Sequence, residues 1–313
     1  MHNKEIVLTL KKTKTMIASS SKERLCQQYF KEQFPFWHCY TCGKTTSILF
    51  TSENTFIYAM NSLAFASYPS PGIKLIAFEI MNNHFHFVIS AKTPDAIQDF
   101  YYLFIKQLSK LLPDCKNITL NIKPIPDLRA LRNTIVYVHR NAYVSNSIFT
   151  PYNYPWSSGS FYFSTTSYSN EFSKIKFSTK RIMFKGRVPA LPDDWKIINN
   201  YISPENYCDI HSGMIMFRDA RHYFVMLSKD VESYRELAVE LDDTDFLSDE
   251  ELFLQIYRIL KEEYRVTKLS ELSKAQVLDV AYKLHFDYRS SNQQIVRLLK
   301  LSIFEVNNLF PTR

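Results

Sequence analysis

Glycine is scarce in this chain, at 5 of 313 residues. The sequence contains no glycine-rich loop that could cradle the phosphates of a nucleotide, which argues against a nucleotide cofactor. Cysteine is as scarce, and its five residues are odd in number and scattered, which favours reduced thiols over a disulfide framework. The sequence also lacks an apolar stretch long enough to span a bilayer and the apolar core of a signal peptide. We therefore expect a cytoplasmic protein.

The abundant residue types favour a folded protein with a polyanionic partner. Hydrophobic residues make up 46% and charged residues 22% of the chain, which is enough apolar material for the cores of two domains. The formal net charge of +7 and a pI near 9.0 favour nucleic acid before a membrane surface. Because the chain has 20 tyrosines, any one of them is by default a packing or surface residue.

The first half of the chain alternates between strand and helix patterns. Two apolar runs, residues 73–81 and 84–90, flank Asn82-Asn83, a favourable hairpin turn. Alternation or strand-forming residues predict further strands, and helical periodicity predicts helices. The remaining elements are expected at 37–41 (strand), 52–67 (helix), 93–112 (helix), 117–122 (strand) and 127–143 (helix). The order β-α-β-β-α-β-α predicts an α+β fold: a split-βαβ (ferredoxin/RRM-like) antiparallel sheet with helices on one face.

The pattern divides the chain into three parts. We expect a polar N-terminal extension at 1–33, a first domain at 34–165 and a mostly helical C-terminal domain at 166–313, although 166–245 is irregular. Three capping boxes open helices, at Ser248 with Glu251, Ser291 with Gln294, and Ser302 with Glu305. The last two bracket helices at 292–300 and 303–310. Residues 291–310 are therefore a helix-turn-helix or, equally, an ordinary helical hairpin.

Two histidines lie two residues apart on a predicted strand. Alternation along a strand puts His84 and His86 on one face and Phe85 and Phe87 on the other. Burying two neighbouring imidazoles without a purpose costs free energy, whereas two neutral imidazoles can hold one metal ion. Taken alone, a His-x-His pair is a weak signal, because such pairs also occur by chance on strands that face solvent.

A second element strengthens the metal hypothesis. On the helix at 127–143, Tyr137 and Asn141 are four residues apart and share one face. The amide oxygen of Asn141 is a hard ligand, and a phenol one turn away could reach a phosphate on the same ion. Two imidazoles, one amide oxygen and open positions suit Mg²⁺ or Mn²⁺ better than a closed zinc site.

Three ordered motifs resemble those of single-tyrosine HUH transposases. The likeness to their His-hydrophobic-His motif lies in MNNHFHFVI, residues 81–89. The segments YVHRNA and YNYPWSS resemble the Tyr-Ile-His-x-Asn-Pro and Pro-Trp-Ser-Ser signatures of REP-associated tyrosine transposases and their insertion-sequence relatives. The resemblance covers about residues 35–163, and His86 lies 51 residues before Tyr137. Asn82 and Ala142 replace two prolines that are usual in the family, and Ala142 could let its helix run on.

The resemblance implies an enzyme that cleaves and rejoins single-stranded DNA. Tyr137 would be the nucleophile, and His84, His86 and Asn141 would bind Mg²⁺ or Mn²⁺. Attack on phosphorus would form a 5′-phosphotyrosine and release a 3′-hydroxyl, and a second 3′-hydroxyl could reverse the step. The resemblance further implies hairpin-containing DNA as substrate, a bacterial protein that is nucleoid-associated when bound to DNA, and either a monomer or a homodimer.

Other functions stay open at this stage. The same fold could be a nucleic-acid-binding module without turnover, or a metal-dependent phosphodiesterase in which water attacks and Tyr137 only positions the substrate. A relaxase of the same superfamily is less favoured, because the histidine motif here precedes the tyrosine.

Several further residues are weaker candidates. Six basic side chains flank the motifs and could follow a DNA backbone, although each alone is more simply a solvated charge: Lys106, Lys110, Arg129, Arg132, His139 and Arg140. The pair Cys39 and Cys42, with His38 alongside, invites a zinc or redox interpretation. With no second cysteine pair at ligand spacing, structural thiols explain it better.

Overall fold

The sheet at the centre of the molecule has four strands. The computed structural model describes residues 21–43, 48–145, 150, 153–164, 170–228, 249–288, 290 and 292–310, and begins with a helical segment over 21–32. The strands are β1 (Phe36–Tyr40), β2 (Ile73–Ile80), β3 (Phe85–Ala91) and β4 (Asn121–Ile125). Their order is β2-β3-β1-β4 with antiparallel neighbours throughout, so β3 lies between β1 and β2, the two strands that α2 (Glu53–Ser67) connects. The predicted α+β class with an antiparallel sheet is confirmed.

Helices cover both faces of this sheet. On one face Phe85 and Phe87 of β3 contact Phe104 and Phe100 of α3 (Pro94–Leu108), with ring centroids 5.2 and 5.9 Å apart. Helix α2 packs beside α3, where the Tyr58 hydroxyl donates to the Gln107 carbonyl at 2.8 Å.

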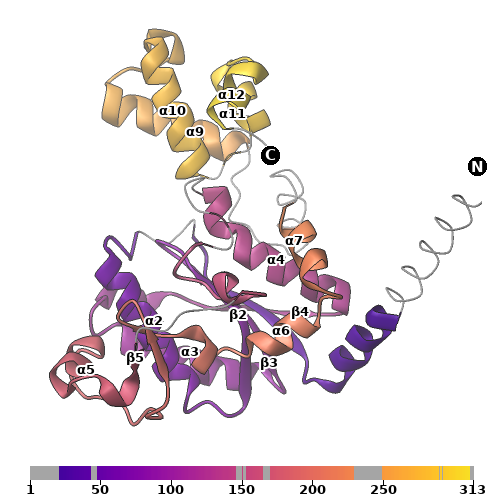
Figure 1. Cartoon of the computed structure of the whole chain (residues 1–313). Coiled ribbons are helices and arrows are strands. Elements are labelled where there is room, and N and C mark those ends of the chain that lie inside the picture. Colours follow the sequence, from indigo (N-terminus) through magenta and orange to yellow (C-terminus); the bar gives the residue numbers. More distant parts are fainter. Residues whose placement is uncertain are drawn as a thin grey trace, which may run out of the picture.

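The expected helices on one face hold for α2 and α3 but not for α4 (Leu128–Ser145). Because side chains alternate along β3, His86 faces the other way, and its ring meets Tyr137 of α4. Figure 1 shows α4 on the side of the sheet opposite α2 and α3.

The residues after α4 extend the sheet along its β2 edge. The Ile80 amide donates to the Trp156 carbonyl at 2.9 Å, and the Ser158 amide donates to the Phe78 carbonyl at 3.0 Å. The Tyr154 hydroxyl donates to the Ile80 carbonyl at 2.7 Å. The Pro-Trp-Ser-Ser segment is therefore a structural part of the first unit, and it satisfies the backbone of an otherwise open edge.

A small second sheet lies within residues 166–245, where the sequence shows no regular pattern. Strands β5 (Asn170–Glu171), β6 (Lys196–Ile198) and β7 (Tyr201–Ile202) pair antiparallel. Three short helices accompany them, α5 (Phe177–Met183), α6 (Ile210–Ile215) and α7 (Ala220–Leu227). In the described residues, short 3₁₀ turns lie at Pro113–Asn117, Gly159–Phe161, Phe172–Lys174, Pro204–Asn206 and Leu269–Glu271.

The C-terminal helices have a core of their own. They are α9 (Asp249–Ile259), extended by a π turn at Leu260–Tyr264, α10 (Lys274–Phe286), α11 (Asn292–Leu299) and α12 (Ile303–Leu309). Ser302 and Glu305 form the predicted capping box, and Lys300 has a φ of 54° in the tight turn before it. The predicted cap residues Ser248 and Ser291 lie outside the described residues. Figure 1 shows these helices gathered at one end of the molecule, beyond α4.

The packing of buried side chains across residue 165 can be compared with the domain boundary expected there. The large core that surrounds the first sheet includes residues well beyond that point, among them Tyr201, Met216, Tyr223 and Leu227. A separate cluster, from Leu252 to Phe310, belongs to α9–α12. The boundary at 165 stays a prediction, and packing favours one after Leu227.

Most predicted elements of the first unit lie within a few residues of the observed ones. The largest difference concerns the strand expected at 117–122, which is β4 at 121–125. Pro113 opens a 3₁₀ turn that occupies residues 113–117, so the chain becomes extended only after it. In the described part of the chain, no helix has the length and apolar character needed to cross a membrane.

Candidate active site

His84 and His86 lie side by side at the start of β3. Their ring centroids are 5.0 Å apart at an interplanar angle of 84°, and both side chains are buried. Nδ1 of His84 is 2.7 Å from Oδ1 of Asn83, and Nδ2 of Asn83 donates to the Gly43 carbonyl at 2.8 Å. The Gly43 bond fixes the orientation of the Asn83 amide, so its oxygen accepts from an Nδ1–H of His84. Nε2 of His84 then keeps its lone pair.

Gly43 is needed where it approaches this histidine. A Cβ added at Gly43 would lie 2.9 Å from Nδ1 of His84, closer than real contacts of that kind. The loop after β1 therefore packs its backbone directly against the imidazole.

Helix α4 brings Tyr137 to the histidines. The ring centroids of Tyr137 and His86 are 5.7 Å apart, and the rings meet edge to face at 84°. Tyr137 is 0% exposed, so its phenol lies inside the protein. Asn141 lies one turn later on the same helix, is also fully buried, and its Nδ2 is 3.5 Å from the Tyr137 carbonyl. The structure thus brings together His84, His86 and Tyr137, and places Asn141 on the same helix as the tyrosine.

His38 belongs to the same cluster, although the sequence pattern associated it only with the pair Cys39 and Cys42. It lies on β1 beside β3, with Nε2 3.4 Å from Nδ1 of His86 and the two rings nearly parallel at 13°. Its ring centroid is 6.0 Å from that of Tyr137. Burial, and then the charges of His86 and Lys123, hold the pKa of His38 well below its ordinary value, so the imidazole is neutral.

Glu79 is a buried carboxylate beside the histidines. It faces His86 directly across the β2–β3 pair and is fully buried. Its Oε1 accepts from the backbone N–H of Ala142 at 2.6 Å, which ties β2 to the helix that carries Tyr137. Sequence reasoning missed this residue. A usable signal was present, because Glu79 is the one charged residue between Leu75 and Met81.

His139 has a structural role in the folded chain. Its Nδ1 is 2.9 Å from the Tyr223 hydroxyl, and its Nε2 is 2.8 Å from the Ser158 hydroxyl. Burial lowers the pKa of His139 to about 3, so the ring is neutral at ordinary pH. The histidine of YVHRNA and the last serine of YNYPWSS are therefore hydrogen-bonded partners, and α7 supplies the third member.

The other basic candidates fall into two groups. Arg132 is buried and donates to the Met216 carbonyl at 2.5 Å and to Glu23 at 2.7 Å, and Arg140 is buried as well. Lys106, Lys110 and Arg129 are exposed. Lys106 and Lys110 extend from α3 and the turn that follows it, on the sheet face opposite Tyr137, so they do not adjoin the candidate site.

A divalent metal ion fits the donors of the site in part. The described residues contain no group of three or more His, Cys, Asp or Glu side chains arranged to hold a metal. The site has two imidazoles, His84 and His86, whose ring centroids are 5.0 Å apart. In His84, the hydrogen bond from Nδ1 to Asn83 leaves the lone pair on Nε2. Metal binding would need oxygen donors to complete the coordination, such as the Asn141 amide or phosphate.

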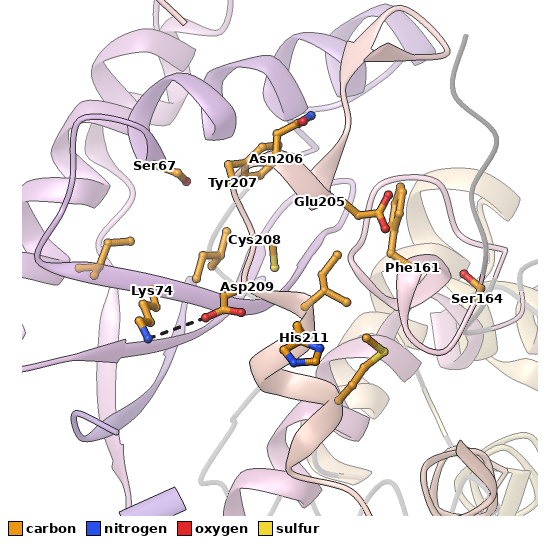
Figure 2. A pocket seen from close by; sticks show the side chains of 14 residues that line it. Ser67, Lys74, Phe161, Ser164, Glu205, Asn206, Tyr207, Cys208, Asp209 and His211 are labelled. Atoms are coloured by element: carbon orange, nitrogen blue, oxygen red, sulfur yellow. Dashed lines mark ion pairs between the residues drawn. The ribbon is translucent and has the colours of Figure 1, made fainter. Parts of the chain in front are cut away.

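One cavity lies apart from this cluster. Its volume is about 500 Å³, and its lining includes Lys74, Glu205, Asp209 and His211. Lys74 and Asp209 are paired across it at 3.9 Å (Figure 2). The cavity contains none of the predicted site residues.

Comparisons with known proteins add little at the level of sequence. No family model matches the chain, and no curated protein matches it. One solved structure is similar, described as "Structure of the REP associates tyrosine transposase bound to a REP hairpin". It is 12% identical, with a TM-score of 0.33, over 53% of this chain and 94% of that chain. A likeness of this size carries no argument about function, so the case for a function rests on the site.

Proposed function

We propose that this chain is a metal-dependent DNA strand transferase and endonuclease of the single-tyrosine HUH type, with Tyr137 as nucleophile. One observation carries the proposal. A tyrosine 51 residues beyond the histidine pair, on a different element, packs its ring 5.7 Å from His86. We propose further that the sheet is of the split-βαβ class, since its order β2-β3-β1-β4 is the one such a unit requires.

In this proposal the residues divide the chemistry among them. His84 and His86, with the Asn141 amide, would hold Mg²⁺ or Mn²⁺, which when bound neutralises charge on the phosphate oxygens. The Tyr137 phenolate attacks phosphorus, the bond between phosphorus and the 3′-oxygen breaks, and that oxygen leaves as a 3′-hydroxyl after taking a proton. The 5′-phosphotyrosine preserves a phosphodiester bond, so attack by another 3′-hydroxyl rejoins a strand.

Single-stranded DNA that contains hairpins is the proposed substrate. The proposal follows from the motif resemblance and from the formal charge of +7, which suits a polyanion. Helices α11 and α12 are proposed to contact duplex DNA as a helix-turn-helix. We propose that the protein acts as a monomer or as a homodimer that shares the site, and that it is cytoplasmic and associates with the nucleoid when bound to DNA.

The burial of Tyr137 favours a second candidate function. A phenol that is 0% exposed cannot reach a phosphate unless surrounding residues move. A DNA-binding module without turnover would use Tyr137 as a core residue packed against His86. The two functions differ in whether a covalent adduct forms.

The test is adduct formation on labelled single-stranded hairpin DNA with Mn²⁺ or Mg²⁺. The parent chain is expected to give a denaturant-resistant protein–DNA adduct that needs metal and disappears in Tyr137→Phe. A matched control is Tyr102→Phe, because Tyr102 is exposed on α3, on the other face of the sheet. Cleavage that persists in Tyr137→Phe without an adduct would indicate attack by water, and binding without cleavage would indicate the non-catalytic module.

A further inference from the structure

Both histidines of the pair are held at the same ring nitrogen. Nδ1 of His84 contacts Oδ1 of Asn83 at 2.7 Å, and Nδ1 of His86 contacts Nε2 of His38 at 3.4 Å. The partners come from different places: Asn83 is a neighbour in sequence, whereas His38 lies on β1. Two separate elements thus each provide a partner for Nδ1, which indicates that Nε2 has the same role in both rings.

We propose that His38 is a positioning residue, which selects the ring nitrogen that His86 offers to a metal ion. This inference rests on the proposed function, because it takes His86 as a metal ligand. A neutral imidazole carries one proton, and only the other nitrogen can bind a metal. With His38 accepting from Nδ1–H of His86, the lone pair of His86 lies on Nε2, as it does in His84.

The opposite proton arrangement would abolish binding. If Nε2–H of His38 donated instead, Nδ1 of His86 would accept and its proton would lie on Nε2, where it blocks the metal. Metal-ligating histidines usually donate their second nitrogen to a carboxylate, a carbonyl or water. Here an imidazole takes that place, and it must carry its own proton on Nδ1.

The surroundings of His38 support a role beyond packing. His38 is 1% and His86 is 0% exposed, so bulk water does not replace the hydrogen bond between them. Among the described residues, Nδ1 of His38 has no hydrogen-bond partner. A buried donor without a partner destabilises the fold, so packing alone would favour an apolar residue at this position.

Mn²⁺ titration of the full chain, followed by electron paramagnetic resonance, tests the inference without DNA or turnover. His38→Phe fills similar space with no acceptor, and we expect its Mn²⁺ affinity to fall about 10–100-fold. His38→Gln can present an acceptor oxygen at similar reach and is expected to retain most of the affinity. Val88→Ala is the matched control, because Val88 pairs with His38 across β1–β3 and its loss alters packing alone.

A second measurement does not depend on any variant folding. Nitrogen-15 spectra of the histidine rings in the unaltered, metal-free protein should show His86 protonated at Nδ1. Protonation at Nε2, or equal Mn²⁺ affinity in the parent chain and a folded His38→Phe, would overturn the inference while leaving the proposed function intact. Failure of the unaltered protein to bind Mn²⁺ would remove the proposed metal site itself.

Discussion

At the scale of single residues, the contact between Glu79 and Ala142 joins the two elements of the candidate site. The family that the motifs resemble usually has proline where this chain has Ala142, and proline has no N–H to donate. Here the Ala142 N–H donates to Glu79, and α4 continues to Ser145. A residue with a backbone N–H at position 142 therefore permits a buried hydrogen bond that links β2 to the helix of Tyr137.

Replacing Glu79 should separate the role of this hydrogen bond from that of the charge. Glu79→Gln keeps an acceptor for Ala142, whereas Glu79→Leu removes it and leaves a buried donor. We expect Glu79→Leu to lower the free energy of unfolding by about 1–3 kcal/mol more than Glu79→Gln does, measured by urea denaturation at pH 7. Equal losses in the two variants would show that the hydrogen bond contributes little.

His139 should make stability depend on pH. Its pKa is about 3 in the folded chain because of burial, and about 6.5 when unfolded. The unfolded chain therefore binds a proton that the folded chain does not, and stability present above pH 6.5 is lost as the pH falls toward 3, by about 1.4 kcal/mol per pH unit. Urea denaturation at pH 7 and pH 5 should show a smaller loss for His139→Gln than for the parent chain. Identical losses would contradict this account.

At the scale of elements, the cap of α12 offers a clean test of the C-terminal hairpin. The Ser302 hydroxyl accepts from the Glu305 N–H at 3.2 Å, and the Glu305 carboxylate accepts from the Ser302 N–H at 2.9 Å. Ser302→Ala should lower the free energy of unfolding of the helices α9–α12 by about 1 kcal/mol. Urea denaturation monitored by the helical circular dichroism signal measures this change. Ser302→Asp keeps a capping acceptor and serves as the control; an equal loss there would count against the capping role.

Strands and helices were predictable from the sequence where the hydrophobic pattern lies within a single element. The hairpin at Asn82-Asn83 and the helical stripe around Tyr137 depend on neighbours in sequence, and they lie close to their predicted bounds. His38 and Glu79 were not predicted as site residues, because the register between β1, β2 and β3 decides which side chains meet His86. The burial of Tyr137 likewise depends on packing between elements, which periodicity does not report.

At the scale of the whole molecule, two units with separate cores imply two unfolding events. The first unit holds the large core, which extends from the sheet to Leu227, and a smaller cluster in which Ala64 of α2 packs with residues between Phe172 and Ile202. The second unit has the core that joins α9–α12 from Leu252 to Phe310. Apolar side chains stabilise the core they pack into, so units with separate cores can unfold separately. Differential scanning calorimetry of the full chain should therefore show two transitions.

Removing residues 249–313 extends this test to function. The transition of the second core should disappear, while that of the first core stays because its packing residues are retained. The shortened chain should still form the Tyr137 adduct on single-stranded DNA, since His84, His86 and Tyr137 all lie in the first unit, and its affinity for duplex DNA should fall if α11 and α12 bind it. A single transition in the full chain, or collapse of the shortened one, would mean that the two cores stabilise each other and that the site depends on both.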